Sequence, residues 1–299
     1  MKKIITIIFV ILAVQQAHAC EFCGCGVGNF YLGILPQFHK NFVGVRYQVS
    51  DFNSHVGLHP SLATSEHFQS TELWTRFYIT PKLQVISLIA YHFNEQTTTT
   101  GKVYLNGLGD IPILANYNVI NTTDQPLREV NHNLWLGGGI KLPTGKYQFQ
   151  DSPDQVANPN FQLGTGSLDF MVNTIYTVRY KKIGLNSDIT YKINSDNQQR
   201  YHFGNKISGT ASFVFVQQVK KVGLMPYLGA YYENSGVNVS DGITISDTGG
   251  TALFAAGGLE MYWSRYSVGF NYRNPVSQNL ANGRINAHER AMIHMTVLF

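Results

Sequence analysis

The sequence predicts an all-β protein, a transmembrane antiparallel up-and-down β-barrel of about 12 strands. Apolar and polar residues alternate through most of the chain, short turns alternate with long polar loops, and the chain ends on an aromatic residue, Phe299. A side-chain period of two is that of a strand with two different faces. Ten or fourteen strands would also fit, because such patterns place strand ends only to within a few residues.

The closing stretch, residues 287–299, shows this alternation. Its odd positions from 291 onward are all apolar, whereas the even positions are mixed and comprise Arg290, Met292, His294, Thr296 and Leu298. A final strand that ends on Phe299 resembles the signal read by the barrel-assembly machinery of bacterial outer membranes. The alternative is an ordinary closing strand of a soluble barrel.

The first 19 residues predict a secretory signal peptide. Lys2 and Lys3 precede an apolar run over residues 4–14, and Ala17, His18 and Ala19 form an A-x-A cleavage site. The apolar run is shorter than the roughly 20 residues that a transmembrane helix needs. We therefore expect export, followed by removal of residues 1–19.

The three cysteines, Cys20, Cys23 and Cys25, all lie in a Cys/Gly-rich segment over residues 20–40, which could plug the barrel or lead into its first strand. An odd number of thiols in an oxidising compartment leaves one beyond a disulfide. Lipidation of Cys20, a disulfide, and contact with copper or zinc all remain open. Three thiolates are fewer than the four ligands usual for structural zinc. The sequence therefore predicts no cofactor, with copper or zinc at these cysteines as the alternative.

Composition separates this chain from soluble enzymes and from helical membrane proteins. Charged residues make up 13% of the 299 residues, about half the ~25% typical of soluble domains, and aromatic residues also make up 13%. Loss of Lys2 and Lys3 leaves 20 basic against 18 acidic residues, a charge of about +2. No basic run is present, and nucleic acid is not an expected partner.

The alternation and the turn signals together define twelve predicted strands and leave no domain boundary within residues 41–299. These strands cover residues 41–51, 71–80, 82–93, 106–120, 131–142, 167–180, 182–194, 205–217, 222–233, 251–263, 265–273 and 287–299. Tight links are predicted at residues 80–82, 180–182, 218–221 and 263–265, and loops at residues 55–67, 97–101, 148–163, 234–250 and 274–286. Short turns on one side and long loops on the other are typical of an outer-membrane barrel.

If the apolar faces meet lipid, a set of charged residues faces the lumen. The predicted cations are Arg46, Arg76, Lys141, Arg179, Lys192, Arg265, Arg273 and Arg290, and the predicted anions are Glu72, Asp169, Asp188 and Glu260. An excess of cations would favour anions or carboxylate-bearing ligands. The alternative is that the charges pair and fill the lumen.

Three motifs add a family resemblance. They are GLGDI at residues 107–111, LGGGIKLPTGKY at 136–147 and GTGSLD at 164–169. Together they resemble the outer-membrane transporter family of the phenol meta-pathway, which is distantly similar to long-chain fatty-acid transporter barrels. The resemblance implies passage of small, often apolar molecules across the outer membrane. The CEFCGCG start departs from the family's pattern and leaves the substrate open.

The expected function is therefore an outer-membrane channel or transporter for small molecules, with outer-membrane lipid and the barrel-assembly machinery as partners. An enzyme is not expected, because no G-x-S-x-G nucleophile motif accompanies the histidines. The alternative function is a structural or interaction barrel that works through its cysteine cluster.

Overall fold

The computed structural model describes residues 40–54, 63–123, 129–147 and 161–299. The predicted signal peptide and the three cysteines lie outside these ranges. The strands are β1 (Phe42–Ser54), β2 (Thr64–Thr80), β3 (Leu83–Thr98), β4 (Gly101–Leu108), β5 (Ile111–Asn121), β6 (Val130–Leu142), β7 (Asp169–Tyr180), β8 (Ile183–Ile193), β9 (Tyr201–His202), β10 (Lys206–Phe215), β11 (Gln217–Val219), β12 (Val222–Ser235), β13 (Asn238–Ser240), β14 (Ile243–Ile245), β15 (Gly250–Trp263), β16 (Tyr266–Leu280) and β17 (Ile285–Leu298).

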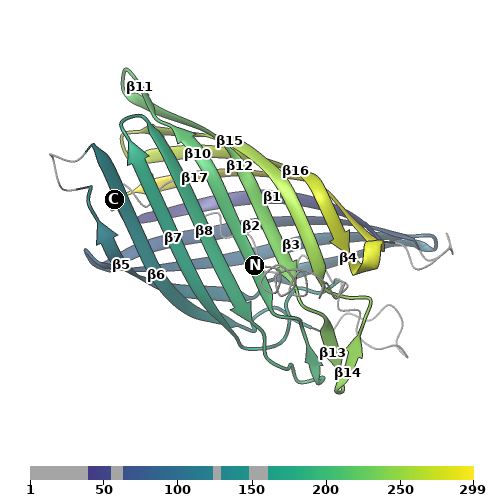
Figure 1. The fold of residues 1–299 in the computed structure, drawn as a ribbon. Coiled ribbons are helices and arrows are strands. Elements are labelled where there is room, and N and C mark those ends of the chain that lie inside the picture. Colours follow the sequence, from purple (N-terminus) through teal and green to yellow (C-terminus); the bar gives the residue numbers. More distant parts are fainter. Residues whose placement is uncertain (1–39, 55–62, 124–128, 148–160) are drawn as a thin grey trace, which may run out of the picture.

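Twelve of these strands form one closed antiparallel barrel, as predicted (Figure 1). Their order is β1, β2, β3, β5, β6, β7, β8, β10, β12, β15, β16, β17, and pairing of β17 with β1 and of β10 with β12 completes the ring. Closure leaves no open sheet edge, which a membrane-spanning sheet requires because lipid cannot satisfy backbone N–H and C=O groups. Two more strands extend the wall: β4 pairs with β3, and β11 pairs with β12.

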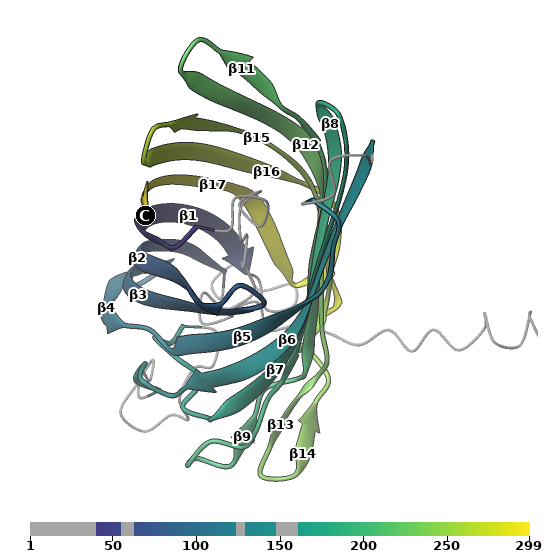
Figure 2. The same ribbon diagram turned by 90° about the vertical axis from the view of Figure 1, so that its left-hand side faces the viewer.

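The two ends of the barrel differ in their connections. At the turn end, two-residue turns at 81–82, 181–182, 220–221 and 264–265 join neighbouring strands. Phe299 N donates there to Asn41 O at 3.0 Å, so the last strand ends beside the first. At the opposite, loop end, most connections are longer, and β9, β13 and β14 form a small separate sheet; Figure 2 shows these strands and β11 at opposite ends.

Four predicted loops are partly wrong. The polar stretch 55–67 already contains the start of β2 at Thr64, and residues 97–101 contain only a two-residue turn. Residues 234–250 contain β13 and β14, and residues 274–286 contain the end of β16, a 3-10 turn at Ala281–Gly283 and the start of β17. A prediction from hydrophobicity assigned these stretches to loops. Strands that extend beyond the lipid layer keep the side-chain period of two, but they no longer have an apolar face. One predicted strand, 106–120, is broken at Gly109 and Asp110, where β4 gives way to β5.

The outer face of the barrel is apolar. On β17, the odd-numbered Ile293, Met295 and Val297 are 41–52% exposed, whereas the even positions between them are buried inside. Leu228 on β12 and Phe213 on β10 are 74% and 68% exposed. A continuous apolar surface of this extent is unfavourable in water and favourable against lipid. Among the described residues, no helix is both long and apolar enough to cross a bilayer.

The predicted glycine-rich strand packs tightly between its neighbours. A Cβ atom at Gly139 of β6 would lie 1.9 Å from Ile113 O on β5, and one at Gly137 would lie 2.0 Å from Asn116 Oδ1. The Ile113 carbonyl belongs to the backbone and cannot move aside as the end of a flexible side chain can. These glycines therefore permit the close approach of β5 and β6.

Gly139→Ala should lower the free energy of unfolding by about 2 kcal/mol, because the new methyl group meets backbone. Urea unfolding of the refolded protein, followed by tryptophan fluorescence, would measure this loss. Gly223→Ala is the control, since its nearest contact is the flexible Gln218 side chain at 3.3 Å. Equal effects of the two substitutions would contradict the packing argument.

Candidate functional site: the barrel lumen

The barrel interior is lined by polar and charged side chains that alternate with the outward apolar ones. Fourteen Asp, Glu, Lys and Arg residues among those described are buried, and we call this set the charge belt. Its cations are Arg46, Arg76, Lys141, Lys192, Lys206, Arg273 and Arg290, and its anions are Glu66, Glu72, Asp110, Asp169, Asp188, Glu233 and Glu260. The belt thus holds seven charges of each sign, rather than the expected excess of cations.

Two predicted lumen cations lie elsewhere. Arg265 is exposed in the turn between β15 and β16. Arg179 is half-buried near the turn end of β7, where its Nε donates to Lys181 O at 2.8 Å. The other ten predicted charges are buried in the belt.

Four belt residues were missed by sequence reasoning: Glu66, Asp110, Lys206 and Glu233. Glu66 lay outside the predicted strand 71–80, which began too late. The other three lay inside predicted strands, near the loop end, but were not assigned to the lumen. One signal was available, because Glu66 and Phe68 continue the inward positions of Glu72 and Trp74.

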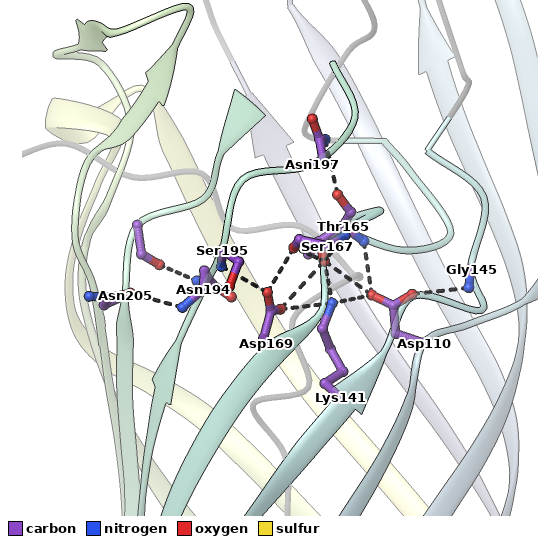
Figure 3. A network of polar contacts seen from close by, with 11 residues as sticks. Asp110, Lys141, Gly145, Thr165, Ser167, Asp169, Asn194, Ser195, Asn197 and Asn205 are labelled. Atoms are coloured by element: carbon purple, nitrogen blue, oxygen red, sulfur yellow. Dashed lines mark hydrogen bonds and ion pairs between the residues drawn. The ribbon is translucent and has the colours of Figure 1, made fainter. Parts of the chain in front are cut away.

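The three motifs that carry the family resemblance meet in one buried network, which Figure 3 shows. Lys141 on β6 pairs with Asp110 and, at 2.8 Å, with Asp169 on β7, and it also donates to Thr165. Asp110 accepts further from Gly145 N at 3.0 Å and Thr165 N at 2.9 Å. The network therefore ties the break between β4 and β5 to both ends of the connection between β6 and β7.

The geometry of this network also explains why two motif positions are glycine. A Cβ atom at Gly164 would lie 2.2 Å from Asp110 Oδ1, and one at Gly145 would lie 2.8 Å from Gly164 Cα. Side chains at either position would push the connection away from Asp110. Ser167 Oγ and Ser195 N donate to Asp169 Oδ1 at 2.7 and 3.1 Å and complete its hydrogen bonds.

A second network spans the lumen around Glu233. Lys206 and Arg290 pair with its two carboxylate oxygens at 3.0 and 2.8 Å, and Tyr231 OH donates to it at 2.8 Å. The Arg290 guanidinium lies 4.2 Å from the centre of the Phe254 ring. Burial makes such cation–π contacts stronger than they are at a surface.

The remaining charges form smaller groups nearer the turn end. Arg46 pairs with Glu72, which also accepts from Gln48 Nε2 at 2.8 Å. Glu260 lies 3.1 Å from His294 Nε2. Lys192, in contrast, lies near the loop end, opposite Lys206 in the β8–β10 ladder, and is 4% exposed.

Apolar side chains fill much of the remaining interior. Toward the loop end, Phe161 from the β6–β7 connection is fully buried against a cluster that includes Phe52, Phe68 and Phe254. At the turn end, Phe42 packs on Trp74. The inward Met292 and Leu298 belong to such clusters, which explains why the even face of the last strand is mixed.

A small cavity of about 20 Å³ remains between the inner walls of β1, β16 and β17. Its polar lining consists of Gln48, Ser50, Asn271, Arg273 and Arg290 and contains no carboxylate. This volume holds about one water-sized group. The cavity is polar, and its cations suit a small anion or a carboxylate group.

The described residues include no group of three or more His, Cys, Asp or Glu side chains placed to hold a metal ion. Copper or zinc at the N-terminal cysteines stays a prediction, because those residues lie outside the described ranges.

Comparison with known structures identifies the fold. An outer membrane channel from Pseudomonas putida F1 aligns with a TM-score of 0.61 and 14% identity over 87% of this chain and 96% of that one. The β-domain of the Bordetella autotransporter BrkA gives a TM-score of 0.51 and 9% identity over 87% and 100%. CymD, a monoaromatic hydrocarbon channel, gives a TM-score of 0.41 and 8% identity over 95% and 94%, too distant to support an inference.

No protein-family model matches the chain, and no curated protein sequence aligns with it. The resemblance drawn from the three motifs is confirmed as a shared barrel fold with an outer membrane channel.

Lys141→Met should lower the free energy of unfolding by about 3 kcal/mol, because it leaves two buried carboxylates without their counter-ion. The triple variant Asp110→Asn, Lys141→Met, Asp169→Asn should recover most of this loss. Urea unfolding of refolded protein measures both. Lys102→Met, which breaks the exposed pair with Glu95, is the control and should change little. A triple variant no more stable than Lys141→Met would contradict this account of the network.

Proposed function

We propose that this chain is an outer-membrane channel or transporter for small molecules. The observation that carries the proposal is the closed twelve-strand barrel, whose outer face is apolar and whose inner face is polar and charged. An apolar exterior fits lipid, and a polar interior fits a path for solutes. The fold shared with the Pseudomonas channel supports the same class of function.

The proposed location is the bacterial outer membrane, reached by export, removal of residues 1–19 and insertion by the barrel-assembly machinery. Short turns of such barrels face the periplasm and longer loops face the outside. This rule places residues 81–82, 181–182, 220–221 and 264–265 in the periplasm. The loop end, with β13 and β14, then faces outward.

The interior supports a substrate that combines an apolar body with a carboxylate. The buried aromatic cluster around Phe161 lies toward the loop end, and the guanidiniums of Arg290 and Arg273 each lie 4.2 Å from one of its rings, those of Phe254 and Tyr231. A molecule in the lumen would thus meet aromatic rings and cations side by side. The anchoring alternative, which depends on Cys20, Cys23 and Cys25, stays a prediction.

Single-channel recording of the refolded full chain in a planar bilayer tests the proposal. Small conductance steps are expected for the wild type, because buried aromatic side chains narrow both ends of the lumen. Phe161→Ala should give larger steps, because it empties part of the cluster at the loop end. If both proteins are folded yet silent, and liposomes that contain them exclude small solutes, the proposal is wrong.

Arg273→Gln should shift the reversal potential under a salt gradient toward cation selectivity, because it removes a positive charge from the wall of the small cavity. Arg179→Gln makes the same charge change at the turn end and should have a smaller effect. Equal shifts in reversal potential for the two variants would show that charge at the turn end affects ion preference as much as charge in the lumen does, against this prediction.

A further inference from the structure

The outer wall carries an open apolar groove that the proposed channel activity does not use. It has a volume of about 760 Å³ and crosses β8, β10, β12, β15 and β16. Phe213, Leu228, Gly257 and Tyr272 form one row across four neighbouring strands. Gly257 has no side chain, and the Leu228 side chain lies against it, with Leu228 Cδ2 3.0 Å from the position of a Cβ atom.

One end of the groove reaches the turn end of the barrel. Ile183, the first residue of β8, lines the groove and is paired with Phe215 of β10, which also lines it. Lys181 and Lys182 form the turn directly before Ile183. Lys182 Nζ donates to Gln217 Oε1 of β11 at 2.8 Å, and β11 leads on to Lys220 and Lys221.

These four lysines form a cationic rim beside the groove. All four are exposed, and none has a carboxylate partner among the described residues. Arg265, exposed in the β15–β16 turn, adds a further cation on the other flank of the groove.

The loop end behaves differently. There the exposed Lys102 and Arg200 and the half-buried Arg284 each pair with a carboxylate, those of Glu95, Asp241 and Asp247. Lys146, also exposed there, has no carboxylate partner among the described residues. Exposed cations without a carboxylate partner thus lie mainly at the turn end, and those beside the groove would attract an anionic group.

We infer that the groove and the cationic rim bind one anionic phospholipid of the periplasmic leaflet. An acyl chain would lie along Phe213, Leu228 and Phe270 above Gly257, and the phosphate would meet the lysines at the rim. Ammonium groups bind phosphate as point charges, and basic residues near a membrane surface attract its anionic lipids. The inference rests on the proposed outer-membrane location, with the short turns toward the periplasm.

Native mass spectrometry of the detergent-purified full chain, mixed with equimolar phosphatidylglycerol and phosphatidylcholine, tests the inference. The wild type should retain phosphatidylglycerol over phosphatidylcholine by about tenfold, as expected for several such charges. Replacement of Lys181, Lys182, Lys220 and Lys221 by Gln should abolish the preference. Lys181→Gln with Lys182→Gln should reduce it.

The matched control is Lys40→Gln with Lys82→Gln. It removes two cations from the turn end on the opposite side of the barrel and should leave the lipid preference intact. Gly257→Leu should reduce retention of both lipids, because its side chain would occupy the groove.

Three results would overturn the inference: no preference in the wild type, a preference unchanged by the four substitutions, or a lipid-free dimer that makes the groove a contact between two copies. Conductance recorded from the same preparations separates this outcome from failure of the channel proposal. A conducting barrel without lipid preference contradicts the lipid site alone.

Discussion

The pairing of buried charges across the lumen is the interaction on which the rest of this structure depends. A barrel that exposes apolar residues to lipid must turn its polar residues inward, where little water remains to solvate them. Single buried charges would be very unfavourable there, and removal of one partner from a buried pair typically costs about 3–5 kcal/mol. Lys141 between Asp110 and Asp169, and Glu233 between Lys206 and Arg290, meet this requirement by pairing different strands. The same contacts hold the strands in register and fasten the β6–β7 connection at the barrel mouth.

This arrangement also limits what the lumen can pass. Equal numbers of cations and anions give the belt no strong net field, so selectivity would come from local groups such as Arg273 and Arg290 rather than from overall charge. Phe161 and its aromatic neighbours restrict the loop end, and Phe42 and Trp74 restrict the turn end. Aromatic side chains at both ends fit a selective path better than a wide pore.

Local patterns were enough to predict the barrel. The period of two identified the lipid-facing positions, the tight turns located the strand ends at the turn end, and the count of twelve strands is confirmed. The loop end was harder, because Thr64–His67 and the break at Gly109 and Asp110 lack an apolar face. The balance of charge could not be predicted, since Glu233 and Arg290 are 57 residues apart and meet only after the ring closes. The convergence of the three motifs on Lys141 likewise depends on tertiary contacts that no local pattern contains.

Each strand of the barrel presents one face to lipid and the other to the lumen. Nitroxide labels at single cysteines along β7, in protein without the native cysteines and reconstituted in liposomes, test it most directly. Labels at Phe170 and Val172 should be accessible to lipid-soluble oxygen and shielded from a water-soluble nickel reagent, whereas labels at Met171 and Asn173 should be shielded from oxygen. That alternation would establish the barrel as a membrane-spanning wall with an inward polar face. Uniform accessibility, or exposure of Phe170 and Val172 to the water-soluble reagent, would contradict it.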